Sequence, residues 1–170
     1  MEKDYKYIPY TRAKKILHDK INHIDLYGDN EEARNVEHVF PQYSFKFDDR
    51  KKVMKSDLHN LYLCNVRLNS CRQNFKYVTH HDAITQTTND KNTYILDQKG
   101  DKMTNYQEVF KKQGYIMSVN RKQKSFIPST FSRGKIARSL SYFAVKYNYI
   151  KELQSIIDIY DLLIWNYSDP

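Results

Sequence analysis

The chain has 170 residues, enough to bury a hydrophobic core, and is most simply one domain spanning residues 1–170. Its 40% hydrophobic and 14% aromatic content argues against disorder, and four Gly and four Pro argue against a linker-rich protein. The 28 Lys and Arg outnumber the 20 Asp and Glu, for a formal net charge of +8. This surplus favours a polyanionic partner, nucleic acid first and an anionic membrane second, with an ordinary basic surface as the alternative.

No segment approaches the roughly 20 apolar residues of a membrane span, and residues 1–6 lead into no apolar run typical of a signal peptide. We therefore expect an intracellular protein with no membrane partner. Cys64 and Cys71 are not spaced as a metal-binding CxxC pair, so we expect reduced thiols, with a disulfide between them left open. Abundant Lys, Asn, Ile and Tyr are typical of AT-rich genomes, which include many viruses, so a viral protein in a host cell is one interpretation.

The first predicted element is an amphipathic helix that starts at Thr11, its expected N-cap. Its apolar positions, spaced three and four apart, are Ala13, Ile16, Leu17, Ile21 and Ile24. Next comes a short strand over 36–40, which Pro41 ends because proline cannot donate to a strand ladder. The region continues with a basic connection over 46–55. A strand in the middle of 58–66 and then a helix over 67–75 are predicted to follow it.

The second half alternates short strands with helices. Strands are predicted at 94–97, 115–119 and 125–127, with a polar loop over 79–90 and a helical segment over 106–110. A helix then begins near Ser132, and a final helix over 150–164 is apolar over much of its circumference, so we expect it to be mostly buried. The first turns of the earlier helix contain three basic residues, Arg133, Lys135 and Arg138. The exposed backbone amides at a helix N-terminus also favour anions.

The most informative local pattern is a carboxylate beside an imidazole, Glu37-His38, followed downstream by Asn69 and Arg72. An imidazole can take a proton from water near neutral pH. Glu and Asn oxygens suit a hard cation such as Mg²⁺, and Arg suits a phosphate oxygen. These residue types are suited to metal-assisted attack on a phosphodiester. Taken alone, however, a Glu-His pair such as Glu37-His38 is more often an ordinary part of a strand, with the two side chains on opposite sides.

Four sequence blocks resemble the endonuclease I family, within the ββα-metal (His-Me finger) nucleases. Residues 35–42, which read Asn-Val-Glu-His-Val-Phe-Pro-Gln, are similar to the family's EHVWPQ signature, with Phe40 in place of the usual Trp. Residues 57–61 resemble its DLHNL block. Residues 69–75 resemble its N-x-x-R-x-N-F block.

The fourth block is residues 133–138, followed by Tyr142 and Tyr147, which is similar to the family's RG-x-IAR helix. All four blocks come in the family's order. The resemblance implies an α+β fold: a ββα-metal finger over about 35–75, flanked by short antiparallel strands and by C-terminal helices over about 133–165.

The resemblance also implies roles for individual residues. His38 is expected to be the general base, with Arg72 as a second catalytic residue that grips phosphate. Glu37 and Asn69 are expected to hold one divalent cation, Mg²⁺ first, with Mn²⁺ or Ca²⁺ as alternatives. Asp57, His59 and Asn60 are expected to support the finger, for instance by orienting His38 through a hydrogen bond.

Nucleic-acid contacts are expected from five basic residues: Arg133, Arg138, Lys135, Arg50 and Lys51. The family cleaves DNA, and often RNA, with little sequence preference, and leaves 5′-phosphate ends. We favour a monomer. The alternatives are a catalytically inactive nucleic-acid-binding protein on the same fold, and a structural or partner-binding basic protein whose tyrosine-rich surface makes the contact.

Overall fold

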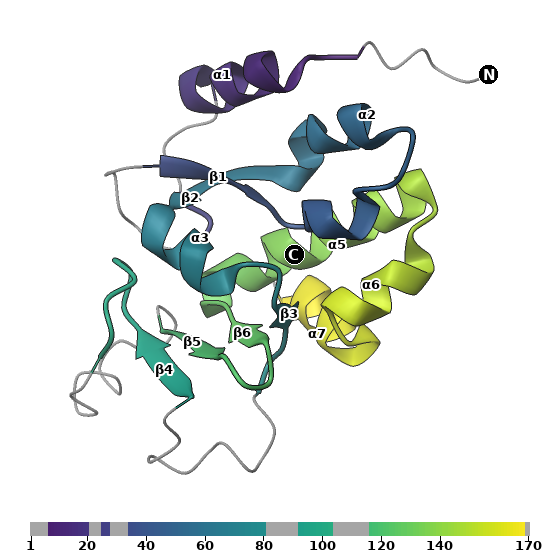
Figure 1. The fold of residues 1–170 in the computed structure, drawn as a ribbon. Helices are drawn as coiled ribbons and strands as arrows, with labels where there is room; N and C mark the ends of the chain where they lie inside the picture. Colours follow the sequence, from purple (N-terminus) through teal and green to yellow (C-terminus); the bar gives the residue numbers. More distant parts are fainter. Residues whose placement is uncertain (1–6, 21–24, 28–33, 81–91, 104–115, 169–170) are drawn as a thin grey trace.

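The computed structural model describes residues 7–20, 25–27, 34–80, 92–103 and 116–168, and it has an α+β architecture (Figure 1). In chain order its elements are α1 (Tyr10–Lys20), β1 (Arg34–His38), the 3-10 turn η1 (Gln42–Phe45), α2 (Lys51–Lys55), the 3-10 turn η2 (Leu58–Asn60), β2 (Leu61–Asn65), α3 (Val66–Arg72), β3 (Lys76–Tyr77), β4 (Thr93–Leu96), β5 (Met117–Asn120), β6 (Ser125–Ile127), α5 (Thr130–Tyr147), α6 (Ile150–Ile156) and α7 (Ile159–Ser168). The predicted fold class is therefore confirmed.

A two-stranded antiparallel ribbon followed by a helix forms the centre of the molecule. β1 pairs with β2 so that Arg34 faces Asn65 and His38 faces Leu61. Asn65 ends the ribbon and caps α3, because its side-chain oxygen accepts hydrogen bonds from the amides of Arg67 at 2.8 Å and Leu68 at 3.3 Å. α3 then packs on both strands. This is the expected ββα arrangement.

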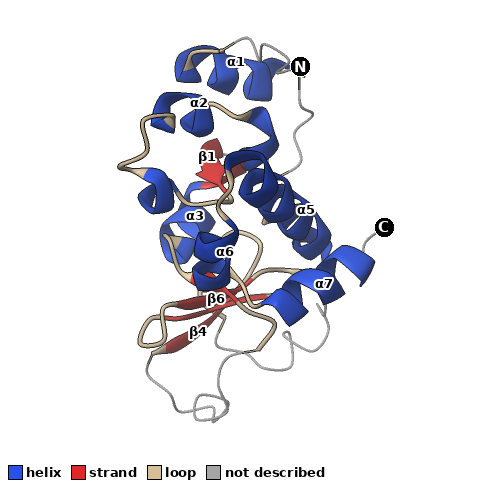
Figure 2. Ribbon diagram, turned by 90° about the vertical axis from the view of Figure 1, so that its right-hand side faces the viewer, coloured by secondary structure: helices blue, strands red, loops and turns tan. Residues whose placement is uncertain are grey.

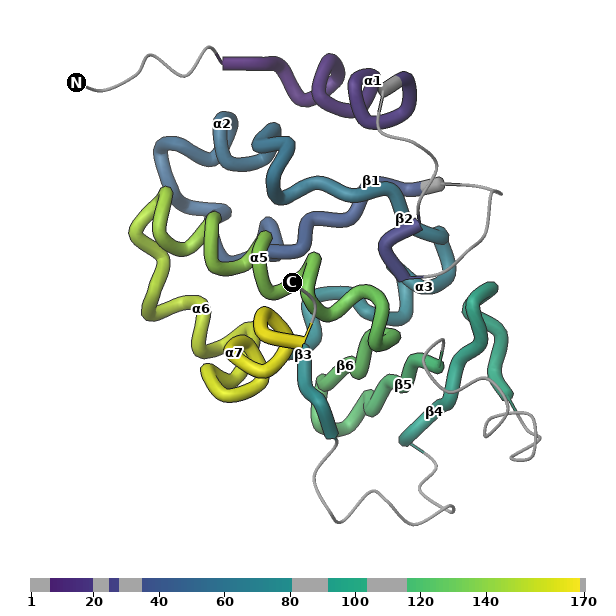
Figure 3. The backbone as a smooth tube through the Cα atoms, turned by 180° about the vertical axis from the view of Figure 1, so that it is seen from behind, coloured from purple at the N-terminus to yellow at the C-terminus, as the bar shows by residue number. Residues whose placement is uncertain are grey.

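The two faces of the ribbon are covered by different helices (Figure 3). On one face, Ala13 and Leu17 of α1 are completely buried against Val36, Leu61 and Leu63. α1 begins at Tyr10, with the Ala13 amide bonded to the Pro9 carbonyl, so Thr11 lies in the first turn and the predicted N-cap is wrong. Residues 21–24 of the predicted helix lie outside the described residues.

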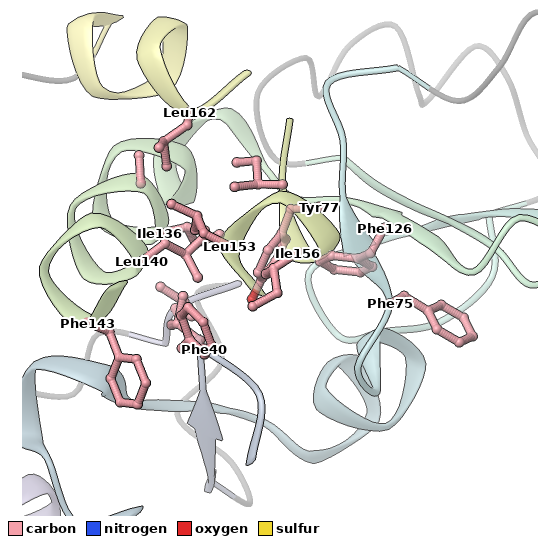
Figure 4. Close-up of a cluster of buried hydrophobic side chains, with 14 of the residues drawn as sticks. Phe40, Phe75, Tyr77, Phe126, Ile136, Leu140, Phe143, Leu153, Ile156 and Leu162 are labelled. Atoms are coloured by element: carbon pink, nitrogen blue, oxygen red, sulfur yellow. The ribbon is translucent and has the colours of Figure 1, made fainter. Parts of the chain in front are cut away.

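On the other side, α5 carries the main hydrophobic core (Figure 4). Its buried Ile136, Leu140 and Phe143 follow the three-and-four spacing of a helix with one apolar face. The ring of Phe143 stacks on that of Phe40 with centroids 4.6 Å apart. Asn148 takes a left-handed conformation with φ 61° and ends the helix.

A second sheet lies beyond α3 and has the strand order β3-β6-β5-β4 (Figure 2). β4–β5 and β5–β6 are antiparallel, as predicted, whereas β3 pairs in parallel with β6 through residues 76–77 and 125–126. The prediction of antiparallel strands is thus incomplete. Two chain segments far apart in sequence meet at this parallel edge.

Two other predicted segments differ from the structure. The basic connection over 46–55 contains a short helix, α2. The single final helix over 150–164 is two helices, because Ile157 is extended, with φ −152° and ψ 149°, and bridges to Tyr77 of β3. α7 is also less buried than predicted, since Tyr160 and Tyr167 are 75% and 89% exposed.

Some expectations concern features outside the main elements. The predicted helix over 106–110 and all but the first two residues of the predicted loop over 79–90 lie outside the described residues. Cys64 and Cys71 are free thiols. None of the described helices combines the length and apolar character needed to cross a membrane.

Candidate active site

The end of β1, the turn that follows it and the C-terminal half of α3 form a pocket of about 210 Å³. It is lined by Val36, Glu37, His38, Pro41, Gln42, Tyr43, Asn69, Arg72, Gln73 and Asn74. Three residues whose types and order in the sequence indicate chemical activity, Glu37, His38 and Asn69, therefore border one cavity. Strand alternation sends the side chains of Glu37 and His38 to opposite sides of β1, and the pocket at the strand edge is bordered by both.

Two hydrogen bonds orient the His38 ring. Its Nε2 lies 2.9 Å from the backbone carbonyl oxygen of Lys55 and therefore carries the proton that it donates. Its Nδ1 accepts from the Gln42 side-chain amide at 3.1 Å. Burial lowers the pKa of His38 to about 4, against the opposite effect of the bond to the Lys55 carbonyl. The ring is thus neutral at pH 7, and Nδ1, which accepts from Gln42 in this structure, is its basic nitrogen.

Within the described part of the chain, the hydrogen-bond donors around Glu37 gather on its Oε1. Oε1 accepts from the Tyr27 hydroxyl at 2.9 Å and the Tyr77 hydroxyl at 3.4 Å, and it lies 3.0 Å from Nη1 of Arg72. The two tyrosine hydroxyl oxygens lie 2.6 Å apart. Because each hydroxyl carries one hydrogen, Tyr27 donates to Glu37 and Tyr77 shares its hydrogen between Glu37 and the Tyr27 oxygen. Burial raises the pKa of Glu37, and the positive charge of Arg72 opposes this rise. Oε2 remains as the oxygen available to a ligand.

Asn69 completes a set of oxygen donors that fits a hard cation. Its amide nitrogen donates to the Val36 carbonyl at 3.4 Å, so its Oδ1 is the atom left for a ligand. Glu37 Oε2 and Asn69 Oδ1 are the oxygen types that Mg²⁺ selects, and Mg²⁺ usually keeps several waters beside one or two protein ligands. No group of three or more His, Cys, Asp or Glu side chains gathers in the described part of the chain.

Arg72 lies beneath the pocket and is 1% exposed. Besides its contact with Glu37, its Nη2 donates to the Val39 carbonyl at 3.0 Å and its Nη1 to the Gln73 carbonyl at 2.9 Å. The guanidinium also lies 4.4 Å from the centroid of the Tyr77 ring. Both Nη atoms of this enclosed side chain are bonded, whereas the buried Nε has no hydrogen-bond partner in the described part of the chain. The expected contact of Arg72 with phosphate stays a prediction. The Arg72 side chain positions Glu37 and the end of β1.

Comparison with known proteins agrees with this geometry. The sequence model of the Endonuclease I family matches residues 2–167, nearly the whole chain. The chain belongs to the endonuclease I family. It is thus a nuclease, a hydrolase that acts on nucleic acid, from a family that is generally metal-dependent. A comparison with curated proteins gave no match.

The residues expected to support the finger do so in different ways in this endonuclease I chain. The Asn60 side chain is fully buried and brackets Phe40, accepting from its amide at 2.6 Å and donating to its carbonyl at 3.0 Å. Asp57 accepts from Lys146 at 2.8 Å and from the Tyr147 hydroxyl at 2.9 Å, which ties η2 to the end of α5. Asn60 and Asp57 thus fix the segments that flank β1 and β2.

His59 does not orient His38, contrary to the expectation. Its ring stacks on Tyr142 with centroids 4.4 Å apart, and its side chain is 67% exposed. The group that orients His38 is instead the backbone carbonyl of Lys55, which no residue-type pattern in the sequence can reveal.

The five basic residues expected to contact nucleic acid are divided between two regions. Arg50 makes two bonds to Asp48, at 3.1 and 2.9 Å, and Lys51 is exposed at the start of α2. On α5, Arg133 is half-buried with its guanidinium 5.5 Å from the centroid of the Trp165 ring. Lys135 is half-buried and Arg138 is exposed. None of the five lines the pocket of Glu37 and His38, and their contacts with nucleic acid stay predictions.

The sequence patterns did not identify Tyr27, Tyr77 and Gln42 as site residues of this family member. Gln42 closes the 35–42 block that carries the resemblance, so the motif itself could have identified it. The two tyrosines lie 10 and 40 residues from Glu37 along the chain, and no local spacing connects them to it. Only the tertiary structure brings them together.

Proposed function

We propose that the protein is a metal-dependent, largely sequence-non-specific endonuclease that hydrolyses phosphodiester bonds of DNA, and of RNA, and leaves 5′-phosphate ends. The single observation that carries this proposal is the His38 ring. It is buried, neutral, and fixed by the Lys55 carbonyl so that Nδ1 is the basic atom on a pocket bordered by Glu37 and Asn69.

In this mechanism His38 Nδ1 takes a proton from water while the water oxygen forms a bond to phosphorus. The bond from phosphorus to the 3′ oxygen breaks, the 3′ oxygen takes a proton from solvent water, and the phosphate stays on the 5′ oxygen of the downstream fragment. Before water binds, the Gln42 side-chain amide, 3.1 Å from Nδ1, fixes the orientation of the ring. The Lys55 carbonyl then stabilises the protonated ring, because it accepts from the opposite nitrogen.

Glu37 Oε2 and Asn69 Oδ1 are the atoms that would hold Mg²⁺. A bound Mg²⁺ would supply Lewis-acid stabilisation of the crowded phosphorus centre and of the leaving 3′ oxygen. Arg72, Tyr27 and Tyr77 keep Glu37 in the orientation that leaves Oε2 free. Binding without sequence preference would rest on phosphate contacts, which depend strongly on salt.

The test compares wild type, His38→Ala and His59→Ala on supercoiled plasmid and on single-stranded RNA, each with Mg²⁺ or with EDTA. His59→Ala is the matched histidine control, because the His59 ring is exposed and stacks on Tyr142, outside the pocket. We expect cleavage only with Mg²⁺, retained in His59→Ala and reduced by at least about a hundredfold in His38→Ala. Intact plasmid with salt-sensitive gel retardation by wild type would identify an inactive binder instead.

A further inference from the structure

Two aromatic rings and a lysine form an exposed surface beside the pocket. Tyr43 in η1 is 64% exposed and Phe47, just after η1, is 87% exposed. The ammonium of Lys46 lies 4.2 Å from the centroid of the Tyr43 ring and 4.7 Å from that of Phe47. One cation therefore contacts both rings, while much of each ring still faces solvent. We call these three residues the aromatic platform.

The platform is continuous with the active-site pocket. Tyr43 lines the pocket that Glu37 and His38 border. Gln42, the neighbour of Tyr43, lines that pocket and also a second one of about 330 Å³. The remaining lining of the second pocket is Phe45, Lys46, Lys51, Lys52 and Lys55. A lysine-lined surface thus leads away from His38, with the aromatic platform at the boundary of the two pockets.

This combination matches the chemistry of a nucleic-acid strand with unpaired bases. Lysine ammonium groups attract the phosphates of any nucleic acid, single- or double-stranded. An exposed aromatic ring contributes only where a base can stack on it, and in a duplex the bases already stack on each other. Base stacking on aromatic side chains beside a basic groove is how proteins hold single strands without reading sequence.

We propose that the aromatic platform stacks unpaired bases next to the scissile phosphate, which makes single-stranded nucleic acid the preferred substrate class. The inference rests on the proposed function, since it assigns the substrate of that same site. The lysines of the second pocket hold the phosphates on one side of the cut, and Tyr43 and Phe47 hold the adjoining bases. The platform then discriminates between unpaired and paired strands.

The test measures binding by fluorescence anisotropy in EDTA, so that no substrate is cleaved. The probes are a labelled oligothymidylate, an abasic sugar-phosphate chain of the same length and charge, and a hairpin duplex. The variants are Tyr43→Ala/Phe47→Ala, the aromatic swap Tyr43→Phe/Phe47→Tyr, and Tyr160→Ala/Tyr167→Ala. The last is the matched control, because Tyr160 and Tyr167 of α7 are equally exposed and line neither pocket.

We expect Tyr43→Ala/Phe47→Ala to weaken oligothymidylate binding about tenfold or more, and to leave the abasic chain and the duplex unchanged within about twofold. The aromatic swap and the α7 control should bind all three probes like wild type. Equal losses on the oligothymidylate and the abasic chain, no loss on either, or no binding by wild type would each overturn the inference.

Cleavage is scored separately, with Mg²⁺. Wild type that cleaves but shows no dependence on the two rings would refute the platform and keep the endonuclease. Wild type that shows the binding pattern without cleavage would refute the endonuclease and keep the platform.

Discussion

Glu37 and Arg72 form an ion pair of 3.0 Å in which the side chains are only 4% and 1% exposed. A charged pair removed from water in this way is held by further bonds, here the two tyrosine hydroxyls on the carboxylate and two backbone carbonyls on the guanidinium. The pair links α3 to the end of β1. The charge of Arg72 opposes the rise that burial causes in the pKa of Glu37, and so favours the ionised carboxylate beneath the pocket.

Removing Arg72 should therefore cost stability. Arg72→Met leaves the Glu37 carboxylate buried without its positive partner, and we expect a loss of about 3–5 kcal/mol in the free energy of unfolding, measured in urea. Arg67→Met is the matched control, because it breaks the exposed Arg67–Asp101 pair and should cost only about 0–1 kcal/mol. Similar losses in the two variants would contradict the structural role given to Arg72.

The two tyrosines should differ in their effect on metal use. Both substitutions remove the 2.6 Å contact between the hydroxyls. Tyr27→Phe also removes the 2.9 Å bond to Glu37 Oε1, whereas Tyr77→Phe also removes the longer contact of 3.4 Å. We expect Tyr27→Phe to raise the Mg²⁺ concentration for half-maximal cleavage by about tenfold, and Tyr77→Phe to raise it less. Cleavage rates over an Mg²⁺ titration measure this. An unchanged requirement in Tyr27→Phe would show that the hydroxyl does not position Glu37.

Activity should persist in mild acid. Because burial lowers the pKa of His38 to about 4, the ring is still neutral and basic at pH 5.5, where an exposed histidine is mostly protonated. At saturating Mg²⁺, which favours ionised Glu37, we expect the cleavage rate at pH 5.5 to lie within about threefold of that at pH 7.5. A rate that falls about tenfold, following a pKa of about 6.5, would contradict this environment for His38.

Asp57 should make the protein sensitive to stronger acid. Burial raises the pKa of Asp57, but bonds from Lys146 and Tyr147 outweigh this, so its net pKa lies below the ordinary value. The carboxylate therefore stabilises the fold above the unfolded pKa of about 4, and this contribution is lost as the pH falls through the lower folded pKa. We expect Asp57→Asn to lose about 1–3 kcal/mol at pH 7 and to converge with wild type in acid.

The measurement for Asp57 is urea unfolding across pH 2 to 7, with exposed Asp49→Asn as control. The control should follow wild type at every pH. A constant difference between Asp57→Asn and wild type across the whole range would show that the loss comes from packing rather than from ionisation.

Much of the ββα unit could be predicted because its signals are local. Short apolar segments predicted a strand over 36–40 and another within 58–66, and the structure has β1 and β2 in these regions. The helical spacing of Ile136, Leu140 and Phe143 predicted α5. The motif blocks likewise identified Glu37, His38 and Asn69 by residue type and order alone, and these three residues border one pocket.

Predictions failed where a distant segment decides the local structure. The apolar pattern over 150–164 reads as one helix, but pairing of Ile157 with Tyr77 breaks it in two. Residue type likewise did not reveal that Arg72 lies beneath β1, enclosed against Glu37. The spacing of apolar residues indicates which face of a helix or strand is buried. It does not indicate which part of the chain covers that face.

The sequence by itself determined the reactive groups, the family and most of the elements, because these depend on residue type and on spacing within a few turns. Only the tertiary structure decided how the groups act. The proton position on His38 depends on the Lys55 carbonyl, and the free oxygen of Glu37 depends on Tyr27, Tyr77 and Arg72. These are contacts between segments 10 to 40 residues apart, and their energies exist only once the chain has folded.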